Sequence, residues 1–579
     1  MKSILMWNCF RYLSGVTLFL WALVVHAVDL PRLVDESPWT PSEHAGATLP
    51  SQELTSRWVY QLLLGEIAAQ RDNFGVAVKN YLDLARATHD PRVARRATEV
   101  ALYAHDPKAA QEAIALWLVA EPKSMEAREA LAALLLSQGK LLDVEEVLVQ
   151  LLASDKTDVG NDFRNLSVIF TEHPDHEAVL RLAERLAEPY PQVPEARYLV
   201  GSAAFLAGKN DQALEEARAA SLLRPGWEAS ALLEGRVLQE QNSEQALAFY
   251  QNFLEQYPQS RDVRLLFARY LVELRDYQKA REQFNVLLDK APNNPDLTLA
   301  VALLTMQLKD YTGAELLYQK ALAQGYRDPD VIRFYLGQVY EEQKQWDKAI
   351  QWYGMVAAGD QLTMAQIRVA LMWAHQNQLK KALDLLHAVP AQTQEQQEQK
   401  VLAEEQMQRE SGDYQGAFDT LTVALHVSPN SPDLLYERAI VADKLNHLDT
   451  LEQDLRKVIA LRPQYAHAYN ALGYSLADRD LRLDEALGLI QEALALAPND
   501  PFIMDSLGWV QFRMGHISES IATLKRAYAL QDDPEIAAHL GEVLWVSGDQ
   551  PAARQTWENS LKANPGNEVL TSAVRRFMH

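Results

Sequence analysis

Two histidines are the residues of this sequence that come closest to a metal-binding arrangement. His173 and His176 lie near each other in the stretch EHPDHE, and imidazole is a common zinc ligand. A zinc site needs three or four placed ligands, and Pro174 opposes a single helix that carries both rings. We therefore predict a loop between helices here rather than a metal site.

Two pairs of adjacent carboxylates, Glu341–Glu342 and Glu404–Glu405, have the chemistry of a general acid and base but not the context. Adjacent glutamates are common on solvated helices, and nothing marks either pair as a catalytic acid and base. The sequence contains no GxxxxGK[ST], GxGxxG, HExxH or GxSxG motif. We predict that the protein is not an enzyme and uses no cofactor and no metal. An enzyme with an unrecognised site is kept as an alternative.

The chain that carries these residues has a repeating sequence pattern. A small residue recurs every 33 to 35 residues through much of the chain, and a second one follows twelve residues later. The first series contains Gly201, Gly337, Gly473, Gly508 and Gly541, with Ala268, Ala302, Ala370 and Ala439 at intermediate steps. Glu234 and Glu405 break the series. Such a period indicates an internal repeat.

Each repeat is predicted to be two helices joined by turns. Apolar residues recur at helical spacing between the small positions, and prolines such as Pro429 and Pro463 end the second helix. Glycine costs roughly 1 kcal/mol relative to alanine in a helix interior, so Gly508 and its equivalents need a structural reason. We predict that they let two helices pack backbone to backbone, where a side chain would hold them apart.

The spacing of a large residue, Leu-Gly, an aromatic residue, Ala and then Pro resembles the tetratricopeptide repeat (TPR). Eleven repeats begin at Pro194, Trp227, Arg261, Pro295, Asp330, Thr363, Glu398, Pro432, Ala466, Pro501 and Pro534. The resemblance implies an all-α, right-handed superhelical solenoid of about fifteen TPR-like helical hairpins. Residues 58–193 are predicted to form divergent hairpins, and residues 194–579 the solenoid of eleven repeats.

The amino terminus has the pattern of a targeting segment. Basic residues precede the apolar run YLSGVTLFLWALVV, which ends shortly before Ala27. This predicts a secretory signal peptide over residues 1–27, with a retained anchor as the alternative, and a periplasmic or cell-envelope location. Cys9, the single cysteine, precedes the apolar run, so no lipid anchor is indicated. Residues 28–57 are rich in Pro, Ser, Thr and acidic residues and predict a flexible polar lead-in.

The charge of the chain narrows the class of partner. A formal net charge of −23 and a pI of about 5.1 argue against nucleic acid, because nucleic-acid-binding proteins present a basic face. An acidic surface also avoids anionic lipid, although peripheral membrane association stays open. We expect protein partners.

A TPR solenoid lines its concave surface with the first helix of each repeat, and the resemblance implies partner contacts from set positions of that helix. In the carboxy-terminal repeats these predicted partner-binding residues are Tyr436, Tyr474, Phe502, Asp505, Trp509, Phe512, Arg513, Glu542 and Trp545. Because aromatic and arginine side chains often anchor interfaces, we expect exposed aromatics beside charges here. The alternatives are that some of these aromatics fill the core between repeats, or that the divergent hairpins between Trp58 and Gln192 carry the functional surface.

The last third of the chain has a more specific resemblance. The stretches NALGYSLADRD and DSLGWVQFRMG, within about Asn470 to Leu561, resemble a group of proteobacterial cell-envelope TPR proteins of the LbcA type. That resemblance implies an adaptor that docks a carboxyl-terminal processing protease and its substrates. The chain departs from the group because no lipidated cysteine is evident. The alternative function is a scaffold for envelope assembly or polysaccharide export.

Overall fold

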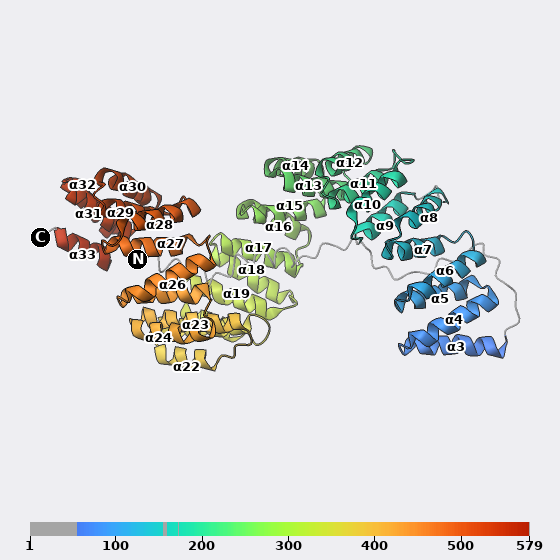
Figure 1. Ribbon diagram of the computed structural model, residues 1–579, viewed down its shortest axis with the longest axis horizontal. Coiled ribbons are helices and arrows are strands. Elements are labelled where there is room, and N and C mark those ends of the chain that lie inside the picture. The colour runs from blue at the N-terminus through green and yellow to red at the C-terminus, as the bar shows by residue number, and fades with distance from the viewer. Residues whose placement is uncertain (1–54, 155–158, 172, 578–579) are drawn as a thin grey trace. The chain divides into compact units, whose positions relative to one another are not determined.

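The computed structural model describes residues 55–154, 159–171 and 173–577. Within these ranges the chain is a series of helices, α3 to α33, joined by short turns (Figure 1). The predicted signal peptide, Cys9 and residues 28–54 of the predicted lead-in lie outside the described residues. None of the described helices combines the length and apolar composition that crossing a bilayer requires.

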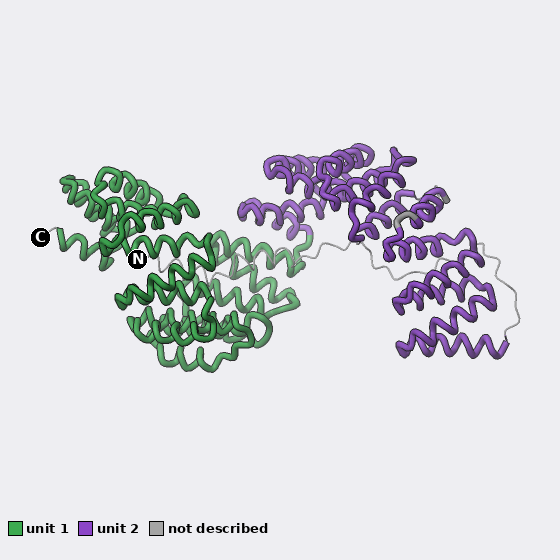
Figure 2. The backbone as a smooth tube through the Cα atoms, viewed as in Figure 1, with its two compact units in different colours: residues 1–27, 291–579 green, residues 28–290 purple. Residues whose placement is uncertain are grey.

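The chain divides into two compact units, coloured separately in Figure 2. The amino-terminal unit ends at Lys290. Its helices are α3 (Ser56–Gln70), α4 (Phe74–Thr88), α5 (Pro91–Tyr103), α6 (Pro107–Ala120), α7 (Met125–Ser137), α8 (Leu141–Ser154), α9 (Val159–Thr171), α10 (His176–Ala187), α11 (Pro194–Leu206), α12 (Asn210–Leu223), α13 (Glu228–Gln241), α14 (Ser243–Gln256), α15 (Arg261–Glu273) and α16 (Tyr277–Lys290).

The carboxy-terminal unit runs on from Ala291. Its helices are α17 (Pro295–Gln307), α18 (Tyr311–Ala323), α19 (Pro329–Glu342), α20 (Trp346–Gly354), α21 (Leu362–His375), α22 (Leu379–Ala388), α23 (Gln394–Glu410), α24 (Tyr414–Val427), α25 (Pro432–Lys444), α26 (Leu448–Leu461), α27 (Ala466–Asp478), α28 (Leu483–Leu496), α29 (Pro501–Arg513), α30 (Ile517–Leu530), α31 (Pro534–Val546), α32 (Gln550–Ala563) and α33 (Glu568–Phe577).

Successive helices pair as hairpins. From α3/α4 to α31/α32 the described helices run as fifteen consecutive pairs, and in fourteen of them the two helices pack on each other, whereas α9 and α10 both pack on α11. The predicted all-α repeat solenoid is confirmed. In the carboxy-terminal unit, a first helix such as α29 packs on its own second helix, α30, and on the first helices of both neighbouring hairpins, α27 and α31. This nearest-neighbour packing is the usual construction of repeat proteins.

Local sequence explains where the helices begin. Proline stands at the first helical position of α29 and α31, where its missing N–H is unneeded. Asp500 caps α29: its carboxylate accepts hydrogen bonds from the backbone N–H groups of Phe502 and Ile503 at 2.9 and 3.1 Å.

The glycines of the repeat lie beneath a large side chain of the second helix. A Cβ placed on Gly508 would lie 2.5 Å from Leu524 Cγ, one on Gly337 2.6 Å from the Tyr353 ring, and one on Gly473 2.6 Å from Ile490. A Cβ on Gly541 would overlap the indole of Trp557.

The contact at these glycines therefore differs from the predicted backbone-to-backbone packing. A side chain of the second helix fills the space that a Cβ would occupy, and at Gly473 the Ala486 carbonyl oxygen also lies close, 2.9 Å away. Gly201 is looser: a Cβ there would lie 3.1 Å from Leu233 of the following hairpin and 3.3 Å from the Ala213 carbonyl oxygen.

One apparent exception in the sequence has a local cause. The repeat spacing puts Glu234 at the small-residue position, but the next residue, Gly235, lies against the hydroxyl end of Tyr250. Helix α13 begins at Glu228, so the register of this repeat is shifted by one residue. The other exception, Glu405, has no neighbouring glycine.

The second series of small residues forms the seam of each hairpin. Each of these alanines has an exposed fraction of 0%: Ala213, Ala246, Ala280, Ala314, Ala349, Ala382, Ala417 and Ala553.

The two ends of the described chain differ. At the carboxy-terminal end, α33 packs on α31 and α32, and the ring of its Phe577 stacks on Trp557 with centroids 5.9 Å apart. At the amino-terminal end, α3 exposes Tyr60, Leu63 and Ile67 on one face, by 64%, 56% and 47%.

We expect Gly541→Ala to destabilise the carboxy-terminal unit by about 1–3 kcal/mol, because the new methyl group overlaps the fully buried Trp557. The matched control is Gly488→Ala in α28, where nothing lies within 4 Å of the new Cβ. The control should gain about 0.5–1 kcal/mol from helix propensity. Thermal melting of the full chain compares the two, and equal shifts would contradict this account of the glycines.

Candidate partner-binding surfaces

The structure brings part of the predicted carboxy-terminal groove together around a histidine. Tyr474 comes from α27, Asp505 and Trp509 from α29, and His539 from α31. Asp505 Oδ2 lies 2.8 Å from His539 Nδ1, and this hydrogen bond fixes the orientation of the ring. The Trp509 ring stacks on the imidazole with centroids 4.3 Å apart, and the Tyr474 ring lies 6.2 Å away.

Half of the predicted aromatics are buried, so the prediction of exposed aromatics is wrong for Tyr436, Phe502 and Trp509. Their exposed fractions are 2%, 6% and 5%, and that of Asp505 is 4%. The physical reason is that first helices of neighbouring hairpins pack directly on one another in this unit. A side chain that leaves one helix toward the groove is covered by the next helix. Trp509 also has an internal partner, since its Nε1 donates to Asp478 Oδ1 at 3.3 Å.

The remaining predicted residues, Tyr474, Phe512, Arg513, Glu542 and Trp545, are half-buried. Arg513 Nε donates to Asp480 Oδ1 at 2.6 Å, and Glu542 accepts a hydrogen bond from Arg576. Both charges are therefore balanced within the chain. Burial, followed by nearby carboxylates, raises the pKa of Tyr474 well above its usual value, so its hydroxyl stays protonated. Their role in partner binding remains a prediction.

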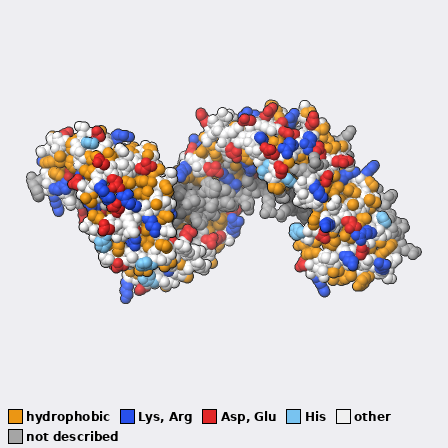
Figure 3. Space-filling model, in the orientation of Figure 1, with side chains coloured by type: hydrophobic (Ala, Val, Ile, Leu, Met, Phe, Trp, Pro, Cys, Tyr) orange, Lys and Arg blue, Asp and Glu red, His pale blue; other side chains and the backbone are white. Residues whose placement is uncertain are grey.

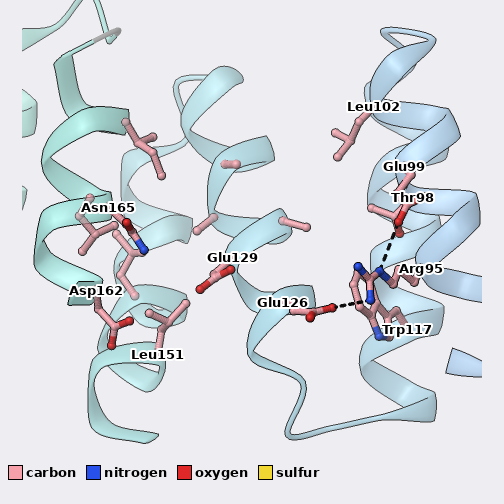
Figure 4. Close-up of a pocket in the computed structure, with 16 residues that line it drawn as sticks. Arg95, Thr98, Glu99, Leu102, Trp117, Glu126, Glu129, Leu151, Asp162 and Asn165 are labelled. Atoms are coloured by element: carbon pink, nitrogen blue, oxygen red, sulfur yellow. Dashed lines mark hydrogen bonds and ion pairs between the residues drawn. The ribbon is translucent and has the colours of Figure 1, made fainter. Parts of the chain in front are cut away.

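A more open cavity lies in the amino-terminal unit, where α5, α7 and α9 supply most of the lining (Figure 4). Its volume is about 400 Å³, within the roughly 300–1,000 Å³ of ligand pockets. The lining residues are Arg95, Thr98, Glu99, Leu102, Trp117, Glu126, Glu129, Ala130, Ala132, Ala133, Leu148, Leu151, Asp162, Asn165, Leu166 and Ile169. We call this cavity the α5–α7–α9 pocket.

Small residues on α7 leave the space that the pocket occupies. Ala130, Ala132 and Ala133 line it from α7. In Figure 4 this helix, which carries the labelled Glu126 and Glu129, lies between α5 and α9. The floor is apolar, with Leu148 and Leu166 contributing from α8 and α9. No residue of this pocket was among those predicted from the sequence, although the alanine-rich stretch EALAALLL was a usable signal.

The rim of the pocket is acidic. Arg95 forms ion pairs with Glu126 at 3.1 Å and with Glu99 at 3.2 Å. Desolvation, followed by the charges of Asp162 and Glu126, raises the pKa of the Glu129 carboxyl. The pocket therefore combines an apolar floor with excess negative charge, which favours an apolar side chain that lies next to a positive charge.

The structure places the two histidines singled out by the sequence at the start of α10, with His173 in the preceding turn and His176 at the first position of the helix. His173 Nδ1 accepts a hydrogen bond from the backbone N–H of Asp175 at 3.1 Å, in the turn before α10. Within the described ranges, no group of three or more His, Cys, Asp or Glu side chains is placed to hold a metal ion.

Comparison with known proteins agrees with the repeat architecture. Tetratricopeptide repeat models match residues 237–304, 299–361 and 506–568. A curated relative, the TPR repeat-containing protein PA4667 of Pseudomonas aeruginosa, is 34% identical over 487 residues, which span 84% of this chain and 82% of the relative.

Two solved structures illustrate the structural matches. The TPR protein TTC0263 of Thermus thermophilus is 26% identical, with 31% of this chain and 99% of that chain covered and a TM-score of 0.29. The APC/C hetero-tetramer Cut9–Hcn1 contains a chain 16% identical, with 84% and 97% covered and a TM-score of 0.33. The kinship rests on the curated relative, whose identity extends over most of both chains. On that ground the protein belongs to the family of tetratricopeptide repeat-containing proteins.

Proposed function

We propose that this protein is an adaptor of the cell envelope that docks a carboxyl-terminal processing protease and its substrates. TPR proteins act in protein–protein interactions, so a scaffold function follows from the family. The predicted signal peptide supports the location, and the resemblance of residues 470–561 to LbcA-type proteins supports the protease as partner.

The α5–α7–α9 pocket is the observation that carries partner binding. It is a preformed cavity on three alternate helices, α5, α7 and α9, and its floor is apolar. A partner segment can bury an apolar side chain there at roughly 25 cal/mol per Å² of apolar area removed from water. The acidic rim selects segments with a neighbouring lysine or arginine. On the face seen in Figure 3, by contrast, acidic and basic side chains are interspersed over both units.

Copurification from crosslinked cells tests the proposed partner. The proposal expects a processing protease among the captured proteins, at a level above that found with an unrelated exported protein. An export or assembly complex in its place would favour the alternative scaffold. Activity of the purified protein alone, without any partner, would instead identify an enzyme.

We expect Ala133→Trp to reduce capture of the partner at least tenfold, because the indole fills the α5–α7–α9 pocket from an exposed position. Helical content should not change. Ala115→Trp on α6 is the matched control, since Ala115 is exposed in the same unit but does not line the pocket. Quantitative pull-down with circular dichroism measures both effects, and equal capture by the two variants would place the binding surface elsewhere.

A further inference from the structure

A second cavity, in the carboxy-terminal unit, has a different chemistry. It measures about 200 Å³ and lies on α21, α23 and α25. Its lining residues are Met364, Glu395, Glu398, Gln399, Leu402, Ala403, Glu405, Gln406, Asp433 and Glu437. We call it the Glu437 socket. Its volume is below the roughly 300–1,000 Å³ of small-molecule pockets and suits a single long side chain.

Four of the five lining carboxylates have hydrogen-bond partners inside the protein. Glu395 Oε1 accepts from Gln399 Nε2 at 3.5 Å. Glu405 Oε1 accepts from Arg409 Nε at 2.5 Å, and Asp433 Oδ1 accepts from Arg462 Nη1 at 2.5 Å. Glu398 Oε2 accepts from the Ser431 hydroxyl at 2.7 Å. These contacts hold the walls of the socket in place.

Glu437 differs from those four carboxylates. Its exposed fraction is 6%, and within the described residues its Oε2 atom has no hydrogen-bond partner. A buried carboxylate oxygen without a donor is costly, because it has lost its water and gained nothing. Oε2 itself is closed to solvent, so a donor in the socket can reach it only after the Glu437 carboxyl group turns toward the cavity that this residue lines. Burial, followed by the charge of Glu405, raises the pKa of Glu437 to about 8, so this carboxyl is protonated at neutral pH in the empty socket, and an ammonium that binds to it would displace the proton.

The shape and the lining narrow the class of ligand. Met364, Leu402 and Ala403 supply apolar wall, while Glu437 and Glu405 supply buried carboxylates. A lysine side chain has this character, since its four methylene groups pack on apolar surface and its ammonium carries three donors. The ammonium is also compact, whereas the planar guanidinium of arginine needs room for a bidentate approach.

We propose that the Glu437 socket binds the side chain of a lysine presented by a partner protein, with the ammonium donating to Glu437. The inference rests on the proposed scaffold function, because it names a chemical feature of the partner. It concerns a different unit from the α5–α7–α9 pocket, so the two sites are separable by mutation.

The test uses small lysine probes and needs no knowledge of the partner. The full chain is labelled with carbon-13 at its methionine methyl groups, and the Met364 signal is assigned with Met364→Leu. Nα-acetyl-lysine methylamide should shift that signal saturably. The norleucine analogue, which has the stem without the ammonium, should not. The arginine analogue should bind at least several-fold more weakly than lysine.

Two variants complete the test. Glu437→Gln should weaken lysine binding at least tenfold, whereas Glu492→Gln, at an exposed position of α28, should leave it unchanged. Equal shifts from the norleucine probe, preferential binding of the arginine probe, or full binding by a folded Glu437→Gln variant would each overturn the assignment. Because the titration contains no partner, its failure is distinct from failure to capture a protease in cells.

Discussion

Replacing Trp509 with alanine is expected to destabilise the carboxy-terminal unit by about 3–5 kcal/mol, the usual cost of removing a buried tryptophan. Trp509 is 5% exposed, stacks on His539 of α31 and donates to Asp478 of α27. It therefore joins three consecutive hairpins, and its loss leaves a cavity beside polar groups that it had covered. Denaturant unfolding of the full chain, followed by tryptophan fluorescence and circular dichroism, measures the loss.

Phe512→Ala is the control for that experiment. Phe512 lies on the same helix, and its ring centroid is 5.3 Å from that of Trp509, but it is only half-buried. We expect a clearly smaller loss of stability, because less apolar area is removed from the core. If Trp509→Ala instead leaves the free energy of unfolding unchanged and weakens partner capture, Trp509 is a binding residue. Its contacts with His539 and Asp478 would then contribute little to stability.

Replacing Glu437 with glutamine is expected to stabilise the protein at alkaline pH by a few kcal/mol. Burial and the charge of Glu405 raise the pKa of Glu437 from 4.5 to about 8. The folded state thus holds this proton more tightly than the unfolded state does. The contribution of Glu437 to stability is greatest below about pH 4.5 and falls as the pH rises toward 8, by at most about 1.4 kcal/mol per pH unit.

Glutamine has no proton to lose, so the variant should escape this loss of stability. Unfolding free energies at pH 4.5 and pH 8.5 should be similar for the two proteins at the lower pH and separate at the higher one. Glu405, Arg409 and Asp433 also face Glu437 and are identical in both proteins. Glu492→Gln, at the surface, should behave as the parent protein does. A Glu437→Gln variant with the same pH dependence as the parent would contradict the titration.

The repeat could be predicted from the sequence because its signals are local. The small residues, the prolines and the helical spacing of apolar residues each reflect packing inside one hairpin or against the next. These local signals were enough to predict the all-helical class and the approximate number of hairpins without knowledge of distant contacts. Even the shifted register at Gly235 is visible as a glycine one step from its expected place.

Exposure at the predicted groove could not be predicted in the same way. Position in the repeat tells which side of a helix Trp509 occupies, but whether that side meets solvent depends on how closely the next hairpin approaches. Close contact of α27, α29 and α31 buries Trp509. In the amino-terminal unit, the α5–α7–α9 pocket remains open instead.

The Glu437 socket had a signal in the sequence that we interpreted as a mere irregularity. Glu405 interrupts the series of small residues, and no neighbouring glycine replaces it. The structure shows why the break matters, since Glu405 is 1% exposed and its charge is one cause of the raised pKa of Glu437. A charged residue at a position where the repeat normally has a small buried residue can thus indicate a site. The sequence alone does not show that Glu405 lies near Glu437 of the next repeat.

The two ends of the described chain differ in how well they are covered, and this difference predicts which end unfolds first. Each hairpin is stabilised by its neighbours, so a terminal hairpin has one stabilising interface fewer than an internal one. Helix α33 covers α31 and α32, whereas α3 leaves Tyr60, Leu63 and Ile67 exposed. Fraying then starts at the α3/α4 hairpin and moves inward one hairpin at a time, and amide hydrogen exchange should record this order as protection that rises from α3 toward the interior of its unit.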